Sequence, residues 1–295
     1  MSDTISSLKR KINSAGDLQS VVRTMKALAA SSVGQYERSV RALGDYAQTV
    51  ELGLGACFRA EEAVPLIREI SGKKKSTISA VVFGSDQGLV GQFNDVVADF
   101  AVKTLAASPG QTSRIWAVGE RVQARLMDVG LPLGDCFTVP GSVKTITPLV
   151  GQILKEHQAH VDSGEISELH LFYNRPTDGA TYAPVAQRLL PLDDSWRKQQ
   201  AEQDWPGKQL PEVLGNVPAS LRALIREYLF VSLFRACAES LASENASRLA
   251  AMQRADKNID ELLTTLHGDF HSLRQSSIDE ELFDVISGFE ALSER

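Results

Sequence analysis

The feature that most constrains the fold of this chain is a stripe of apolar and small residues at each end of the sequence. From Ile5 to Leu54 these residues recur at steps of three and four, with a gap at Gln19, and the first proline is Pro65. A similar stripe runs from Leu221 to Ser277, and no proline follows Pro218. This period predicts an amphipathic helix, and its persistence over about seven heptads is typical of a coiled coil.

Each stripe predicts a helix too long for a compact domain. At a rise of 1.5 Å per residue, a helix over residues 3–57 is ~80 Å long and one from Pro218 onward exceeds ~100 Å. Gly16, Gly34 and Gly44 each cost roughly 1 kcal/mol relative to alanine in a helix, so the first helix needs a partner. Small residues between 242 and 251 allow two backbones to approach closely. We therefore predict that residues 1–60 and 218–295 form an antiparallel coiled coil.

Residues 77–192, between the two helices, alternate short β-branched or aromatic runs with helical stretches. The predicted strands are Ile78–Phe83, Ile115–Val118, Cys136–Val139, Leu169–Tyr173 and Arg188–Leu190. The predicted helices are Asn94–Ala107, Glu120–Val129 and Ile146–Gln158. Such alternation predicts an α/β domain with a small, mostly parallel, Rossmann-like sheet. Residues 193–217 are predicted to form a polar, proline-bearing crossing segment that leads to the last helix.

Composition argues against several classes of protein. The formal net charge is −6, whereas nucleic-acid binders usually carry a basic excess, and the run Lys73–Lys75 is expected to be a solvated loop. Cys57, Cys136 and Cys237 have no paired spacing, so neither a disulfide framework nor a thiolate metal site is expected, and a reducing compartment fits best. No apolar run reaches the ~20 residues of a membrane span, and the first residues lack a secretory signal.

The stretch GSDQGLVGQFND at residues 84–95 follows a predicted strand and precedes a predicted helix. It therefore has the local shape of a phosphate-binding turn. Gly84, Gly88 and Gly91 do not fit the dinucleotide fingerprint, and the stretch lacks the Gly-Lys-Ser/Thr of a P-loop. A tight reversal with close helix packing is the favoured explanation of the glycines, and a phosphate cradle is the alternative that stays open at this point.

Other polar groups do not converge on a catalytic pattern. His267 and His271 lie four apart, but no H-E-x-x-H motif is present, so no metal site is predicted. His157 and His160 lie near a helix end and are expected to be solvated. Ser85–Asp86 has no nucleophile elbow around it, and Asp279–Glu281 is expected to face solvent or a basic partner. No catalytic, cofactor-binding or metal-binding residue is therefore predicted.

Several segments carry a resemblance to a known family. TMKALAAS at 24–31, GSDQGLVGQFN at 84–94, LLPL at 189–192, ASENASRLAAMQRADKN at 242–258 and LRQSSIDEELFDVISG at 273–288 resemble the gamma subunits of F-type ATP synthases. The similarity covers essentially the whole chain. The family's S-D-R-G-L-C-G-G turn has Gln87, Val90 and Gln92 at three positions here, its Y-N pair is Phe270–His271, and Asp279 replaces a threonine.

The resemblance implies a non-catalytic central rotor shaft, with no cofactor of its own. Such a shaft couples ion flow through the membrane c-ring to ATP synthesis or hydrolysis on the surrounding alpha and beta subunits, and it also contacts the epsilon subunit. The implied place is peripheral, at the cytoplasmic face of the inner (plasma) membrane. The alternatives are a nucleotide- or metabolite-binding α/β enzyme with coiled-coil arms and a purely structural coiled-coil adaptor.

The resemblance also implies contact residues. Met25 lies where the shaft faces the mobile lever of a beta subunit, although its place on the apolar stripe equally fits core packing. Gln87 replaces an arginine that contacts an acidic partner loop. Arg274, Gln275 and Glu281 lie in a polar contact zone of the upper shaft, and the alternative for them is an ordinary solvated helix face.

Overall fold

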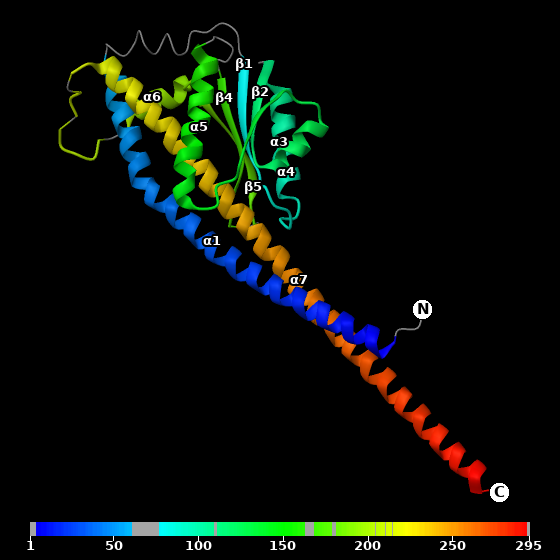
Figure 1. Ribbon diagram of the computed structural model, residues 1–295. Coiled ribbons are helices and arrows are strands. Elements are labelled where there is room, and N and C mark those ends of the chain that lie inside the picture. The colour runs from blue at the N-terminus through cyan, green and yellow to red at the C-terminus, as the bar shows by residue number, and fades with distance from the viewer. Residues whose placement is uncertain are drawn as a thin grey trace. The chain divides into compact units, whose positions relative to one another are not determined.

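The computed structural model describes residues 4–60, 77–108, 111–162, 168–178, 181–203, 205–209, 211–213 and 215–293 (Figure 1). Its elements are α1 (Ile5–Arg59), β1 (Thr77–Phe83), α3 (Phe93–Ala107), β2 (Gln111–Val118), α4 (Glu120–Asp128), β3 (Leu133–Phe137), α5 (Val143–Asp162), β4 (Glu168–Arg175), β5 (Ala183–Leu190), α6 (Asp194–Glu202) and α7 (Val217–Ser293). The predicted loop at Lys73–Lys75 lies outside the described residues.

The chain divides into two compact units, which are described separately. Unit 1 comprises Met1–Ala29 and Leu249–Arg295, and unit 2 comprises Ala30–Arg248. Each of the two long helices, α1 and α7, therefore contributes to both units. The domain division drawn from the sequence places each helix in one domain, and that division stays a prediction.

Unit 2 contains a five-stranded sheet in the order β3-β2-β1-β4-β5. β1 is parallel to β2 and β4, β2 is parallel to β3, and only β5 is antiparallel to its neighbour. The mostly parallel α/β fold predicted from the sequence is thereby confirmed. Helices α3 and α4 cover one face of the sheet, while α5 and the first part of α7 cover the other (Figure 1).

The residues of β1 show how the sheet separates two apolar cores. Ile78, Ala80 and Val82 pack in the cluster that contains α3 and α4. Val81 and Phe83 pack in the larger cluster that contains α5, α1 and α7. Successive strand residues point to opposite faces, so a strand that is apolar throughout must be covered on both sides.

Three local expectations need correction. The strand predicted at Cys136–Val139 is β3, Leu133–Phe137, because the chain joins the sheet edge earlier. The last strand is longer than Arg188–Leu190 and begins at Ala183. The segment 193–217 was expected to be a polar crossing without a helix, but it contains the helix α6. The side chain of Asp193 accepts a hydrogen bond from the Ser195 N–H at 2.8 Å and caps that helix.

Helices α1 and α7 run antiparallel in unit 2, as predicted. Tyr46 donates a hydrogen bond to Glu227 at 2.8 Å. Further along α1, Gly53 approaches Leu224, whose nearest side-chain atom would lie 3.2 Å from an added Cβ. Residues further along α1 therefore contact residues nearer the start of α7, as the antiparallel direction requires. Their apolar stripes are buried in one core, which also contains the face of the sheet that α5 covers. We call this face the inner face of the sheet.

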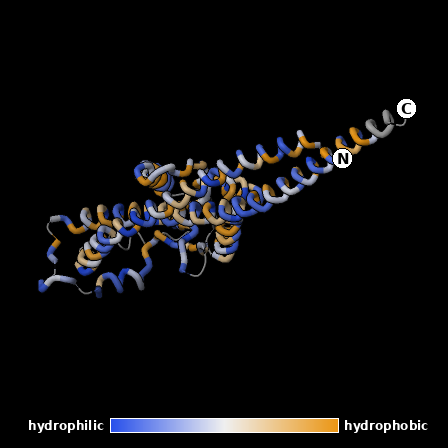
Figure 2. The backbone as a smooth tube through the Cα atoms, turned by 90° about the horizontal axis from the view of Figure 1, so that it is seen from below, coloured by the Kyte–Doolittle hydropathy of each residue, from blue (hydrophilic) through white to orange (hydrophobic). Residues whose placement is uncertain are grey.

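The same pairing continues in unit 1. Leu8 and Leu266 share one buried cluster. Val22, Met252 and Ile259 share another. Hydrophobic and hydrophilic stretches alternate along both terminal helices, as an amphipathic pair requires (Figure 2). The antiparallel association of the two ends of the chain is thus present in each unit.

Gly55 marks a place where α6 approaches α1 closely. A Cβ built on Gly55 would lie 2.4 Å from the carbonyl oxygen of Gln200, which is backbone and cannot swing aside. We expect Gly55→Ala to lower the free energy of unfolding by about 1–3 kcal/mol through overpacking. Urea unfolding monitored by circular dichroism measures the change.

Gly44→Ala is the matched control on the same helix, because nothing lies within 4 Å of its added Cβ. It should raise stability by about 0.5–1 kcal/mol through helix propensity. Equal effects of the two substitutions would contradict the packing of α6 on α1.

Candidate partner-contact sites

The turn between β1 and α3 owes its glycines to close packing. A Cβ on Gly84 would lie 2.3 Å from the Cβ of Val122 in α4. Gly119, with φ of 116°, would place a Cβ 2.8 Å from the backbone of Ser85. Gly84 therefore makes room for the Val122 side chain, and Gly119 lets the start of α4 approach the backbone of Ser85. This close packing favours the packing interpretation of the turn.

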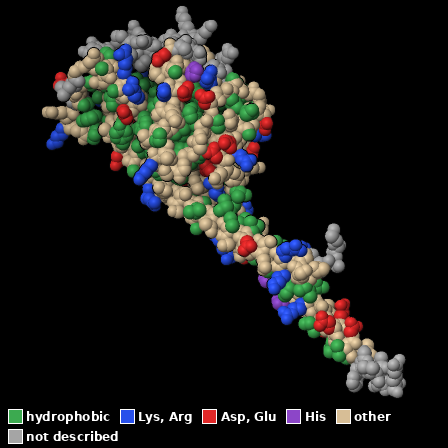
Figure 3. Space-filling model, viewed as in Figure 1, with side chains coloured by type: hydrophobic (Ala, Val, Ile, Leu, Met, Phe, Trp, Pro, Cys, Tyr) green, Lys and Arg blue, Asp and Glu red, His purple; other side chains and the backbone are tan. Residues whose placement is uncertain are grey.

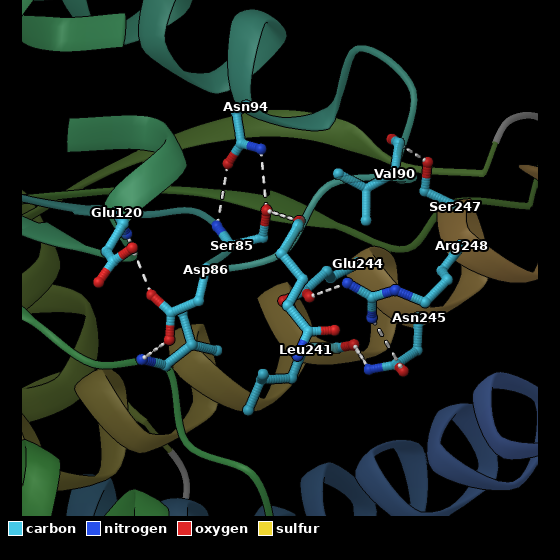
Figure 4. A network of polar contacts seen from close by, with 12 residues as sticks. Ser85, Asp86, Val90, Asn94, Glu120, Leu241, Glu244, Asn245, Ser247 and Arg248 are labelled. Carbon is cyan, nitrogen blue, oxygen red and sulfur yellow. Dashed lines mark hydrogen bonds and ion pairs between the residues drawn. The ribbon is translucent and has the colours of Figure 1, made fainter. Parts of the chain in front are cut away.

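Ser85 is held by Asn94, the second residue of α3. The Ser85 N–H donates to Asn94 Oδ1 at 2.9 Å, and Asn94 Nδ2 donates to Ser85 Oγ at the same distance (Figure 4). Ser85 Oγ in turn donates to the Gln87 carbonyl at 2.9 Å. The buried hydroxyl is thus committed to the turn itself.

Asp86 occupies the position where an anion would bind in a phosphate site. Its two carboxylate oxygens accept hydrogen bonds from the Glu120 N–H at 3.0 Å and the Val139 N–H at 2.9 Å (Figure 4). Glu120 begins α4, so the protein's own carboxylate sits at a helix N-terminus. These donors are not available to a phosphate.

The far side of the turn is attached to α7. Ser247 Oγ donates to the Val90 carbonyl at 2.6 Å. One turn earlier, Glu244 forms a buried ion pair with Arg248 at 2.7 Å (Figure 4). Burial raises the pKa of Glu244, while Arg248 opposes that rise. The polar network therefore joins the turn to the helix that continues toward the C-terminus.

Gln87, the predicted contact residue of the turn, is exposed. Leu89 beside it is 60% exposed and adopts the left-handed conformation, with φ of 62°. A bulky residue in that region costs free energy, so the surrounding hydrogen bonds must hold it there. The turn thus presents Gln87 and Leu89 to solvent on a fixed backbone.

Removal of the Asp86 carboxylate should destabilise unit 2. Asp86→Ala leaves the Glu120 and Val139 N–H groups without their acceptor, and we expect a loss of about 1–2 kcal/mol. Chemical unfolding measures this loss. Asp128→Ala, at the exposed end of α4, is the control and should stay within about 0.5 kcal/mol of the unmodified chain. A negligible effect of Asp86→Ala would contradict its capping role.

The helix pair of unit 1 carries a charged cluster on one flank. Asp256 accepts from Arg23 Nε at 3.1 Å and from Lys26 Nζ at 2.5 Å. Asp260 lies 3.5 Å from Arg23 Nη2 and accepts a hydrogen bond from Gln19. The side chain of Asp256 is only 13% exposed. Hydrogen bonds from Lys26 and Arg23 lower the pKa of Asp256 despite its partial burial.

Met25 is half-buried beside this cluster. It packs against Val22, Met252 and Ile259, which form a buried group between α1 and α7. The residue therefore contributes to the helix interface and keeps part of its side chain at the surface. Core packing and partner contact are both compatible with that position.

Arg274, Gln275 and Glu281 are all exposed on α7. Arg274 lines a shallow hollow with Phe270 and with Thr4–Ser6, at the start of α1. The structure places Glu281 further along α7, apart from that hollow. The sequence grouped the three as one polar zone, and all three lie in unit 1.

The end of α7 also exposes apolar side chains that sequence reasoning did not single out. They are 46–70% exposed: Ile278, Leu282, Phe283, Val285 and Ile286. Acidic side chains gather near this end with hydrophobic ones beside them (Figure 3). Exposed apolar residues at this density indicate a surface that another protein covers. The signal was present in the letters LFDVI, which follow the last position of the apolar stripe.

The histidines do not assemble a metal site. His267 and His271 are exposed. In the described part of the chain, His, Cys, Asp and Glu side chains form no cluster of three or more that could hold a metal ion. The expectation that His157 is solvated was wrong, because it is 3% exposed and packs on Trp116. Burial and the neighbouring His160 lower the pKa of His157 to about 4.

The charged cluster around Asp256 predicts a pH dependence. A carboxylate whose pKa is lowered on folding adds stability above its unfolded pKa of ~3.9, and that stability is lost as the pH falls through the folded value. Asp256→Asn should therefore melt at a lower temperature than the unmodified chain at neutral pH, and the difference should disappear in acid. Thermal melts at several pH values test this, with the exposed Asp269→Asn as control. A difference that persists unchanged in acid would contradict the ion-pair account.

The fold and these surfaces define a class of protein with an antiparallel pair of long helices. The sequence between the two helices forms a small α/β sheet domain. A sequence model of the ATP synthase family, described as "ATP synthase", matches residues 4–292. Curated proteins named ATP synthase gamma chain match over nearly their full length. The chain belongs to this ATP synthase gamma-chain family.

Individual relatives have low sequence identity to this chain, but the alignments cover nearly the full length of both sequences. The chain is 26% identical to the ATP synthase gamma chain of Sorangium cellulosum, with 99% of each sequence covered. It is 27% identical to that of Moorella thermoacetica, with 97% of this chain and 98% of the relative covered.

Solved structures agree with the fold. The rotor of the Euglena gracilis mitochondrial ATP synthase aligns with a TM-score of 0.59 at 17% identity, covering 93% of this chain and 98% of that one. A chain from the OSCP/F1/c-ring assembly of the same enzyme aligns with a TM-score of 0.61 at 19% identity, covering 98% and 94%. Among the described residues, no helix is both long enough and apolar enough to cross a membrane.

Proposed function

We propose that this chain is the central rotor shaft of an F-type ATP synthase and performs no bond chemistry itself. The observation that carries the proposal is the match of the family over residues 4–292, since it includes both long helices as well as the α/β unit. The antiparallel helix pair fits the role, because two interlocked helices resist separation when torque is applied to them. The Asp86 carboxylate at the start of α4 supports the non-catalytic part of the proposal.

The mechanism follows from the unequal sides of the helix pair. In unit 1 one flank carries the ion pairs of Asp256, whereas Leu18, Val21 and Leu28 of α1 are 54–64% exposed. A shaft that turns inside a ring of alpha and beta subunits presents each catalytic site with a different surface in turn. Each surface favours a different conformation of the site, so rotation changes the sites in sequence.

The proposed partners are the alpha and beta subunits, the epsilon subunit and the membrane c-ring. One similar structure comes from an assembly of OSCP, F1 and the c-ring, which supports this set. The chain would then be peripheral, at the cytoplasmic face of the inner (plasma) membrane. We propose Met25, Gln87, Arg274, Gln275 and Glu281 as rotor residues that contact these partners.

Co-expression with alpha and beta subunits of the same complex tests the proposal. The chain should co-purify with them in a fixed ratio and should be required for their coupled ATP turnover. By itself it should show neither saturable ATP binding nor ATPase activity. Saturable ATP binding to the isolated chain, together with a failure to assemble, would favour the enzyme alternative.

Arg274 and Gln275 give the sharpest residue-level prediction. The guanidinium fork can grip a carboxylate bidentately, and the neighbouring amide adds a donor and an acceptor. Both side chains are exposed in unit 1, so their removal should not change the fold. Arg274→Ala with Gln275→Ala should slow ATP turnover of the assembled complex about tenfold or more, because charged hydrogen bonds worth ~1.5–3 kcal/mol are lost.

The control for this pair is the thermal stability of the isolated chain, which should be nearly unchanged. Lys257→Ala on the same helix, whose side chain is 78% exposed, should leave turnover near that of the unmodified complex. Normal turnover by an intact assembly that carries the double substitution would refute the proposed contact.

A further inference from the structure

Unit 2 contains a cavity whose lining includes none of the proposed contact residues. Its volume is ≈ 360 Å³, and it lies between α1, β5, α6 and α7. Two arginines line it, Arg175 at the end of β4 and Arg235 on α7. A volume of this size falls at the lower end of the ~300–1,000 Å³ typical of small-molecule pockets.

A shared carboxylate fixes both arginines. Arg175 Nε donates to Glu239 Oε2 at 2.7 Å, and Arg235 Nε donates to Glu239 Oε1 at 2.7 Å. Glu239 is 5% exposed, so both of its oxygens are engaged in a buried setting. A guanidinium anchored through Nε keeps its terminal nitrogens in a defined plane, which makes it a preorganised donor.

The terminal nitrogens of Arg235 have donor capacity to spare. Among the described residues, they make no hydrogen bond, and the side chain is 54% exposed. One terminal nitrogen of Arg175 donates to the Tyr173 hydroxyl. Both oxygens of Glu239 are therefore engaged, while the guanidinium groups that border the cavity keep N–H donors to spare.

The rest of the cavity wall combines aromatic and weakly charged groups. The rings of Trp196 and Tyr228 lie with centroids 5.0 Å apart and both line it. Glu51 of α1 also lines it, and burial raises the pKa of this carboxyl, with Arg235 opposing the rise. The cavity thus offers arginine donors, an apolar surface and one carboxyl that is poorly solvated as an anion.

We propose that this cavity binds a carboxylate attached to an apolar body, with Arg235 as the principal ligand and Trp196 and Tyr228 as the apolar wall. Arginine matches a carboxylate with two parallel hydrogen bonds, and these gain strength in a partly desolvated site. The carboxylate belongs either to a free organic acid or to an Asp or Glu side chain of a partner subunit. The inference does not depend on the rotor function.

Binding of 4-fluorobenzoate to the isolated full chain, followed by ¹⁹F NMR, tests the proposal. The unmodified chain should shift and broaden the ¹⁹F signal with saturation. Arg235→Gln should weaken binding roughly tenfold or more, since hydrogen bonds to charged groups contribute ~1.5–3 kcal/mol. Glu239 keeps Arg175 as a partner in this variant, and circular dichroism checks that it folds.

Two further variants make the test independent of that one substitution. Glu51→Gln removes a like charge from the cavity wall and should tighten binding. Arg222→Gln, at an exposed position of α7, changes net charge equally and should leave binding unchanged. The absence of saturable binding to the unmodified chain would refute the proposal, as would equal weakening by Arg235→Gln and Arg222→Gln.

The assembled complex separates the two sources of the carboxylate. If a partner's side chain fills the cavity, 4-fluorobenzoate binds the isolated chain and is excluded from the complex. If the natural ligand is a free acid, binding is retained in both. If the complex fails to assemble, the proposed rotor function is contradicted. The binding result with the isolated chain still tests the cavity proposal.

Discussion

The antiparallel pairing of α1 with α7 is the interaction on which the rest of this structure depends. Neither helix can bury its apolar stripe alone, and α1 carries four glycines between Gly34 and Gly55 that weaken it in isolation. In unit 2 the pair also supplies one wall of the core beneath the sheet. Loss of the pairing would therefore expose the stripe in both units and remove the cover from the inner face of the sheet.

The turn after β1 shows how a nucleotide-like loop can serve another purpose on the same fold. The Ser85 N–H of the turn donates to Asn94, and the Glu120 N–H at the start of α4 donates to Asp86. Ser247 then ties the turn to α7. The result is a rigid surface that carries Gln87 and Leu89 and is mechanically linked to the long helix, which suits the transmission of force better than the capture of a substrate.

Much of the fold could be predicted because its signals are long and periodic. The apolar stripes of α1 and α7 repeat often enough to show that both segments are helices and which side of each helix is buried. The continuous apolar run of β1 similarly indicates a buried strand. α6 and the start of β3 were missed, since α6 relies on an Asp193 cap and contacts to α1 rather than on periodicity. His157 was misplaced because burial depends on Trp116, far away in sequence. The roles of Met25, Gln87, Arg274, Gln275 and Glu281 depend on partner chains and stay predictions.

Rotation of this chain inside an assembled complex is the most direct measurement of the central claim. Cys136 is exposed while Cys57 and Cys237 are buried, so a thiol-reactive probe can be attached at one native position. Partial desolvation raises the pKa of the otherwise exposed Cys136 thiol, and labelling should therefore be done at mildly alkaline pH. With alpha and beta subunits fixed to a surface, ATP should drive the probe in one direction. A complex that hydrolyses ATP at its full rate while the probe stays still would contradict the account.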